Sequence, residues 1–210
     1  MERIICLAIG YVFGLFQTGY LYSKAHNMDI RNYGSGNSGS TNVLRVMGIK
    51  AGFIVFIGDC SKMIFACLLT RFLFREQPGM IYVYLLYTGF GVILGHNFPF
   101  YMGFKGGKGI AASAGLLVAM DWRVMLVCLV VFVLVVAITR YVSLGSILVM
   151  ILFLVGMIFF AVKGDFGVDG AALPEFCVMA MVISMMGIWR HRTNIRRLLS
   201  GTENKLGAKK

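Results

Sequence analysis

The sequence predicts an all-α protein, a polytopic bundle of membrane-spanning helices that forms one transmembrane domain over residues 1–210. Of the 210 residues, 59% are hydrophobic, and the mean hydropathy is +0.81. The apolar residues gather in long runs, and twenty basic residues outnumber nine acidic ones. A soluble globular domain does not have this composition, so the chain is expected to be an integral membrane protein.

Seven apolar runs are candidates for membrane spans, and they cover residues 4–23, 51–70, 80–95, 109–120, 124–139, 142–162 and 171–189. A spanning helix needs about 17 to 25 residues, a length that most of the runs reach or approach. We expect seven spans, with six as the alternative, because run 109–120 has a length typical of re-entrant or buried segments. The first run exceeds the apolar core of a signal peptide and is followed by a basic segment, so we expect it to remain as a span.

The basic residues predict the orientation, because short loops rich in lysine and arginine stay in the cytoplasm. With seven spans and the N-terminus outside, the inside segments hold fourteen of the twenty, including Lys209 and Lys210, and the outside segments hold five. Lys62 lies within a span. The C-terminus is then cytoplasmic.

Three polar segments interrupt the apolar runs, and each combines glycine with asparagine and basic residues. The first polar segment is 34–45 (GSGNSGSTNVLR), the second is 95–109 (GHNFPFYMGFKGGKG) and the third is 190–205 (RHRTNIRRLLSGTENK). Glycine lets backbone N–H groups close around an anion, and the cationic and amide side chains supply further donors. All three follow odd-numbered spans, so they are expected to share the cytoplasmic face and to bind phosphate. Six spans would place the third on the other side.

The first polar segment matches the glycine spacing of a dinucleotide-binding loop but lacks the strand and βαβ unit that such a loop needs. We expect a helix through Arg45, capped by Ser40 or Thr41, on which Thr41, Asn42 and Arg45 lie close enough to address one anion. The alternative is a solvated connecting loop. Asn37, Asn42 and Arg45 favour binding.

The second polar segment resembles a nucleotide-binding P-loop but fails the match, since Met102 and Gly109 replace its first glycine and its Ser or Thr. Lys105 and Lys108, separated by Gly106 and Gly107, still form a compact cationic turn. Residues 105–109 are called the lysine turn below. The N-terminus of an expected helix 110–120 would point at this turn and favour phosphate. His96 is expected at the membrane surface, where a lone histidine usually serves only as a hydrogen-bonding residue.

The third polar segment is expected to continue the last span as a helix, which places His191 and Asn194 one turn apart. Gly201 suits the end of that helix, with Glu203 beyond it. Binding of the basic residues to anionic lipid is the alternative, but Arg190, His191 and Asn194 exceed what such anchoring requires. Asp59 and Lys62 lie one turn apart inside the second run and are expected to pair, because a single charge is costly there.

Other classes are disfavoured by the same residues. The five cysteines lie in apolar runs without paired spacing, so neither a disulfide framework nor a metal site is expected. The basic residues border membrane spans, which favours contact with membrane lipids over nucleic acid. A metal-dependent phospholipid synthase would need clustered carboxylates, which the three polar segments lack. A transporter for a small phosphorylated solute is the main alternative, and it predicts broken helices and paired repeats.

Taken together, the three segments strongly resemble the motifs of the PlsY family of membrane acyl-phosphate:glycerol-3-phosphate acyltransferases. The shared patterns are SGNxGxTNVxR, GHxFPx4FKGGKG and RHRxNIxRLxxGxExK, in that order along the chain. The resemblance implies a bacterial inner-membrane enzyme, without a cofactor or metal, that moves a fatty acyl group from acyl phosphate to glycerol 3-phosphate. It also implies functional coupling to an enzyme that produces acyl phosphate, and an active site that faces the cytoplasm.

The resemblance also implies roles for individual residues. The expected catalytic residues are Ser35, Arg45, His191 and Asn194, and Asp59, Lys62 and Glu203 are expected to be structural. The expected substrate- and phosphate-binding residues are Gly36, Asn37, Gly39, Thr41, Asn42, His96, Lys105, Gly106, Gly107, Lys108, Gly109 and Arg190. The chain departs from the family in having Thr193 where Glu is common, and Ser38 and Ser40 where Ile and Ala are usual. Because an acyl phosphate already has a good leaving group, direct displacement without an acyl-enzyme is expected, with His191 or a substrate phosphate oxygen as proton acceptor.

Overall fold

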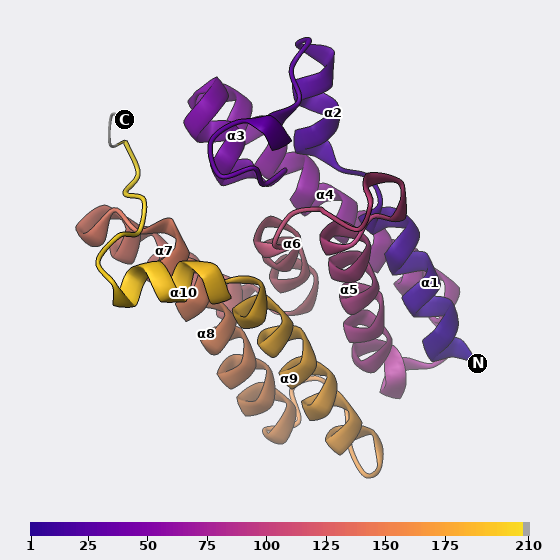
Figure 1. Cartoon of the computed structure of the whole chain (residues 1–210). Coiled ribbons are helices and arrows are strands. Elements are labelled where there is room, and N and C mark those ends of the chain that lie inside the picture. Colours follow the sequence, from indigo (N-terminus) through magenta and orange to yellow (C-terminus); the bar gives the residue numbers. More distant parts are fainter. Residues whose placement is uncertain (208–210) are drawn as a thin grey trace. The chain divides into compact units, whose positions relative to one another are not determined.

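The computed structural model describes residues 1–207, which form helices and connecting turns without a β-strand (Figure 1). Lys209 and Lys210, counted above among the cytoplasmic cations, lie outside the described residues. The chain divides into two compact units, residues 1–120 and 121–210, which are described separately. The expectation of one domain over residues 1–210 remains a prediction.

The first unit contains six α-helices and three short 3-10 turns within the described residues. The helices are α1 (Glu2–Gly14), α2 (Thr18–Ala25), α3 (Ser40–Met47), α4 (Ile49–Leu73), α5 (Ile81–Asn97) and α6 (Ile110–Met120). The 3-10 turns are η1 (Ile30–Asn32), η2 (Pro78–Met80) and η3 (Phe100–Met102). The second unit contains α7 (Trp122–Thr139), α8 (Val142–Val162), α9 (Ala172–Arg190) and α10 (Arg192–Leu199).

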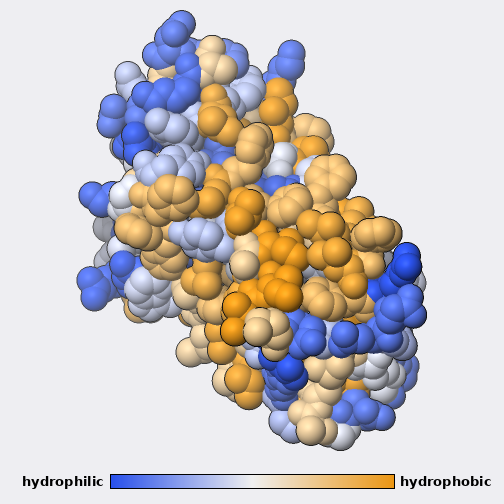
Figure 2. Space-filling model, turned by 90° about the vertical axis from the view of Figure 1, so that its right-hand side faces the viewer, coloured by the Kyte–Doolittle hydropathy of each residue, from blue (hydrophilic) through white to orange (hydrophobic). Residues whose placement is uncertain are grey.

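Over residues 1–207, six helical segments are long and apolar enough to be candidate membrane spans, and the expected fourth span is the shorter apolar helix α6. The six candidate spans are Glu2–Ala25, Ile49–Leu73, Pro78–Met102, Trp122–Thr139, Val142–Val162 and Ala172–Arg190. Whether the chain crosses the membrane seven times, as the shared face of the three polar segments requires, stays a prediction. Figure 2 shows many hydrophobic residues exposed on the face in view, as expected for a surface that contacts lipid.

Helix α6 is short and runs beside only the second half of its neighbour α4. The Cys60 thiol, near the middle of α4, donates to the carbonyl of Ala111 at the start of α6, with a separation of 3.0 Å. Arg71, near the end of α4, donates to the carbonyl of Ala119 at 3.0 Å. The lysine turn before α6 therefore lies level with the middle of α4 instead of at its end.

The expected first span is broken, because α1 ends at Gly14 and α2 begins at Thr18. The carbonyls exposed by the break accept hydrogen bonds from distant side chains. Tyr101 donates to Leu15 O at 2.6 Å, and Lys62 donates to Phe16 O at 2.7 Å. Residues 4–23 alone could not reveal this, since both donors lie more than forty positions away in the sequence.

Helices α1 and α5 lie side by side through facing glycines (Figure 1). A Cβ on Gly91 would overlap the Leu7 carbonyl and come within 3.0 Å of the Gly10 Cα, and Gly95 faces Gly14 in the same way. Both helices carry glycine at a spacing of four residues, which lets the two backbones approach closely. This spacing is visible in the sequence and would have predicted the close contact.

The substitution Gly91→Val is expected to separate α1 from α5 and to destabilise the first unit. An added side chain that meets backbone cannot be accommodated by a rotamer change, and overpacking of this kind costs about 1–3 kcal/mol or more. The unfolding midpoint in detergent measures the effect. Ala137→Val on the exposed side of α7 is the control, and equal midpoints for the two variants would contradict the packing.

Candidate active site

The first polar segment is organised around the side chain of Asn42, which is buried. Its Nδ2 lies within hydrogen-bonding reach of the carbonyls of Ile30, Tyr33 and Asn37 at 3.4, 3.0 and 2.9 Å. Its Oδ1 accepts from the backbone N–H of Ser35 at 2.8 Å. Asn42 thus fixes the loop that presents Ser35 and Gly36 at the surface, and its expected contact with substrate remains a prediction.

Helix α3 begins at Ser40, one residue earlier than a Ser40 cap and two earlier than a Thr41 cap would require. Gly39 is its N-cap residue and no side chain caps the helix, so the expected caps are wrong. Asn37 Oδ1 instead accepts from the Gly39 N–H at 2.9 Å. Thr41 lies in the first turn of α3 and Arg45 in the last, both partly buried.

The structure brings the first and second polar segments together. Asn37 Nδ2 donates to the carbonyl of Gly106, in the lysine turn, at 3.4 Å. The residues involved are 69 positions apart in sequence. Two of the three segments that were expected to bind phosphate therefore meet at one place in the first unit.

The lysine turn folds back onto the end of α5. The N–H groups of Gly106 and Gly107 donate to the carbonyls of Asn97 and His96, both at 3.1 Å. Lys105 is exposed and Lys108 is partly buried. Gly109 has φ of +83°, which favours glycine, and directly precedes α6, whose first N–H groups add positive potential beside the two lysines.

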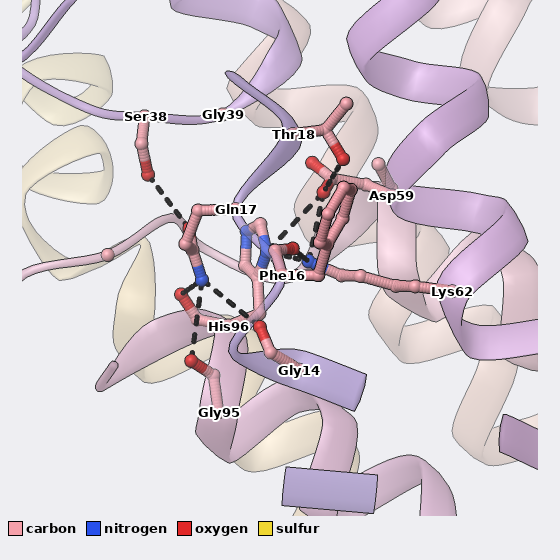
Figure 3. A network of polar contacts seen from close by, with 12 residues as sticks. Gly14, Phe16, Gln17, Thr18, Ser38, Gly39, Asp59, Lys62, Gly95 and His96 are labelled. Carbon is pink, nitrogen blue, oxygen red and sulfur yellow. Dashed lines mark hydrogen bonds and ion pairs between the residues drawn. The ribbon is translucent and has the colours of Figure 1, made fainter. Parts of the chain in front are cut away.

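A buried ionic network packs against the inner side of this turn (Figure 3). Lys62 Nζ lies 2.9 Å from Asp59 Oδ1 and 2.8 Å from His96 Nδ1, so the expected pairing of Asp59 with Lys62 is present. Thr18 Oγ1 donates to the same Asp59 oxygen at 3.0 Å. His96 is only 3% exposed, so it is buried in the protein, and its expected position at the membrane surface stays a prediction.

The network also sets the tautomer of His96. An ammonium group donates but cannot accept, so Nδ1 of His96 must accept from Lys62. A neutral His96 then carries its proton on Nε2, next to Gly107, where any side chain on Gly107 would overlap the ring. The imidazole therefore packs directly under the lysine turn.

Gln17 is a buried residue of the site that the sequence did not identify. It lies at the break between α1 and α2, and its amide contacts both polar segments of the first unit (Figure 3). Its position inside an apolar run was the available signal, because a buried polar side chain needs hydrogen-bonding partners.

In the second unit, the third polar segment does not continue α9. Helix α9 ends at Arg190, and after a break at His191 the chain forms α10 in a different direction (Figure 1). The expected continuous helix is therefore wrong. His191 is the N-cap of α10 and its carbonyl accepts from the Ile195 N–H at 2.8 Å, so His191 and Asn194 still lie about one turn apart, and both side chains are buried. His191 Nδ1 lies 2.8 Å from the Gly187 carbonyl, which can only accept, so in a neutral His191 Nε2 is the basic nitrogen.

Glu203 anchors the chain after α10. It accepts from Ser143 at 3.1 Å, from Asn194 at 2.9 Å and from Arg197 at 2.7 Å. Gly201, with φ of +70°, lets the chain turn at the end of α10, where its N–H and that of Thr202 donate to the Leu198 and Arg197 carbonyls. Burial raises the pKa of Glu203, but the hydrogen bonds from Arg197 and Asn194 outweigh it and hold the pKa below its usual value.

The lowered pKa predicts how stability depends on pH. The contribution of Glu203 is fully present above the ordinary glutamate pKa of about 4.3 and is lost as the pH falls through the lower pKa of the folded protein. Glu203→Gln is expected to remove about 1.5–3 kcal/mol at neutral pH and to flatten the acid side of the stability curve. Unfolding midpoints at several pH values measure this.

Glu76→Gln is the control for the pH series, because the Glu76 side chain is 86% exposed. If Glu203→Gln and the unmodified protein lose stability in parallel between about pH 6 and pH 3, the anchoring role is contradicted.

The chemistry of the first unit suits anionic ligands. Lys105, Lys108 and the start of α6 supply positive charge, and the glycine-rich loop of the first polar segment lies against the lysine turn through Asn37. Within the described residues no group of three or more His, Cys, Asp or Glu side chains is arranged to hold a metal ion.

Comparison with known proteins agrees with this arrangement. A family model described as glycerol-3-phosphate acyltransferase matches residues 4–201. Glycerol-3-phosphate acyltransferases of Clostridioides difficile (strain 630) and Thermoanaerobacter sp. (strain X514) are 41% and 39% identical, and the alignments cover 99% and 100% of this chain and 97% and 98% of the relatives.

Two solved structures are similar over the same length. One is PlsY (YgiH), an integral membrane glycerol 3-phosphate acyltransferase, in its glycerol 3-phosphate form, with a TM-score of 0.83 and 34% identity over 99% of this chain and 96% of that one. The lysophosphatidic acid form of PlsY gives a TM-score of 0.81 and 33% identity with the same coverage. The chain is therefore an integral membrane, multi-pass protein that belongs to the PlsY family of glycerol-3-phosphate acyltransferases.

Proposed function

We propose that this protein transfers a fatty acyl group from an acyl phosphate to the 1-hydroxyl of glycerol 3-phosphate, and that the products are lysophosphatidic acid and inorganic phosphate. The observation that carries the proposal is the contact between the first polar segment and the lysine turn. Two loops rich in cationic and N–H donors meet there, which suits a reaction between two phosphate-bearing substrates.

The site would act mainly by alignment and electrostatics. Lys105, Lys108 and Arg45 would neutralise phosphate charge, and Ser35 and the glycine N–H groups would orient the donor. Holding two reactants in place contributes up to about 7–11 kcal/mol, which suits a donor that already carries a good leaving group. The fatty chain would stay in lipid beside the exposed apolar surface.

The bond changes would occur in one displacement. The glycerol oxygen attacks the acyl carbon, the bond from that carbon to the phosphate oxygen breaks, and inorganic phosphate leaves. The proton of the hydroxyl passes to His191 Nε2 or to a substrate phosphate oxygen, and Asn194 would donate to the oxyanion. This step requires the third polar segment to join the first two, which is part of the proposal.

The setting would be the bacterial cytoplasmic membrane, with the N-terminus outside and the active site facing the cytoplasm. Acyl phosphates are reactive anhydrides, so an enzyme that produces them is the expected functional partner. The neighbouring lipids would receive the product directly.

The alternative of a transporter is disfavoured, although the first membrane segment is broken, as in many transporters. Three side chains of the protein, however, donate to the carbonyls at the break, namely Gln17, Tyr101 and Lys62. These three donors occupy carbonyl oxygens that could otherwise bind an ion. The break therefore contributes to the packing around the lysine turn.

The test is a turnover assay with purified, reconstituted protein and palmitoyl phosphate, with and without glycerol 3-phosphate. Equal amounts of phosphate and lysophosphatidic acid are expected, and only when the acceptor is present. Phosphate release in the absence of glycerol 3-phosphate would show that the protein only hydrolyses acyl phosphate. A labelled protein adduct formed from labelled palmitoyl phosphate alone would contradict direct displacement.

A further inference from the structure

Gln17 has an unusual position, since it is 1% exposed at the break between α1 and α2. Its Nε2 lies within reach of three carbonyls, those of Gly14 at 3.2 Å, Gly95 at 3.4 Å and His96 at 3.0 Å. Its Oε1 accepts from Ser38 Oγ at 3.3 Å (Figure 3). One side chain thus binds the end of α1, the end of α5 and the first polar segment.

The His96 carbonyl links Gln17 to the lysine turn. The same oxygen accepts from Gln17 Nε2 at 3.0 Å and from the Gly107 N–H at 3.1 Å. On the other side, Ser38 lies between Asn37, which contacts Gly106, and Gly39, the N-cap of α3. The hydrogen-bonded path from Ser38 through Gln17 and His96 to Gly107 therefore connects the two loops in addition to the contact of Asn37 with Gly106.

The loops also meet through Asn37 and Gly106, in a part-buried contact. That bond, 3.4 Å long, and the 3.3 Å bond from Ser38 to Gln17 are both long for hydrogen bonds. The two contacts differ because Gln17 is buried and its Nε2 also reaches carbonyls at the ends of α1 and α5, whereas Asn37 is partly exposed. Bonds that are protected from water are not exchanged for solvent, so the relative position of the loops depends more on Gln17 than on Asn37.

We infer that Gln17 is a positioning residue, which sets the distance between the first polar segment and the lysine turn so that two bound phosphate groups react. The inference rests on the proposed function for its catalytic consequence. Each loop keeps its own cations and N–H groups when Gln17 is replaced, so ligand affinity changes little. Alignment between the ligands is lost, and a displacement of about 1 Å can lower the rate by about 100-fold.

The substitutions Gln17→Met and Ser38→Ala test the inference in the reconstituted full-length protein. Methionine has a similar size but cannot bridge the loops, so kcat is expected to fall by about 10- to 100-fold while KM for glycerol 3-phosphate stays within about threefold. Ser38→Ala removes only the link to the first segment and is expected to lower kcat by about three- to tenfold. The double variant should resemble Gln17→Met, because both changes break one connection.

Ser40→Ala is the matched control, a hydroxyl two residues from Ser38, and it should leave kcat unchanged. Unfolding midpoints establish that the variants remain folded, and Ser38→Ala alone decides the matter if Gln17→Met does not fold. An unchanged kcat in both single variants, or independent effects that multiply in the double variant, would overturn the inference.

Amide hydrogen exchange tests the connection between the two loops independently of catalysis. Gln17→Met is expected to raise exchange at least tenfold in peptides covering both the first polar segment and the lysine turn, whereas Ser40→Ala is not. An unmodified protein that makes no lysophosphatidic acid would defeat the proposed function. Unchanged exchange in both loops of Gln17→Met would defeat the positioning role whatever the activity.

Discussion

Lys105→Met and Lys108→Met are each expected to lower kcat/KM by about 100-fold or more, while the protein still inserts and folds. Methionine keeps most of the side-chain volume but removes the charge. Loss of one preorganised donor from a site that stabilises negative charge typically costs about 100- to 1,000-fold. Both lysines flank two glycines whose N–H groups are held by the end of α5, so the turn itself should survive the change.

Steady-state kinetics with palmitoyl phosphate and glycerol 3-phosphate measure this effect. Lys163→Met is the control, because it removes a largely exposed lysine between α8 and α9. Kinetics of the Lys105 and Lys108 variants that match the control would exclude the lysine turn as a phosphate site.

Lys62→Met is expected to have the largest effect on stability. Asp59 and Lys62 are 1% and 5% exposed, and their charged atoms are 2.9 Å apart. Removing the ammonium leaves a buried carboxylate without its counter-charge, and breaking a buried pair in this way costs about 3–5 kcal/mol. The Phe16 carbonyl and His96 Nδ1 lose their donor at the same time.

The double variant Asp59→Asn/Lys62→Met separates charge from packing. It is expected to recover much of the lost stability, because no unpaired charge remains. Free energies of unfolding in mixed detergent micelles measure both variants. A Lys62→Met protein as stable as the unmodified one would show that the ion pair does not support the fold.

The helices that depend on local sequence were well predicted. Helix α8 occupies residues 142–162 as expected, and α6 runs from residue 110 to 120, because apolar composition and length are local properties. The two glycine-rich segments also meet at one site, as their shared composition suggested.

Features that depend on distant partners were not predictable in this way. The break after Gly14 exists because Lys62 and Tyr101 supply donors to its carbonyls, and the break at His191 is accompanied by a bond to Gly187. Asn42 resembled a ligand-binding residue, but its amide organises the loop. Side-chain chemistry in a sequence does not say whether a donor faces a ligand or the protein's own backbone.

The central claim is that the three polar segments share the cytoplasmic face, where they hold two anionic substrates together. Single cysteines at Asn32, Phe104 and Thr202, in a background without the five native cysteines, test it with a membrane-impermeant thiol reagent in sealed, oriented vesicles. All three positions are exposed in the structure. Labelling of all three from the cytoplasmic side is predicted, and labelling of Thr202 from the opposite side to the other two would contradict the claim.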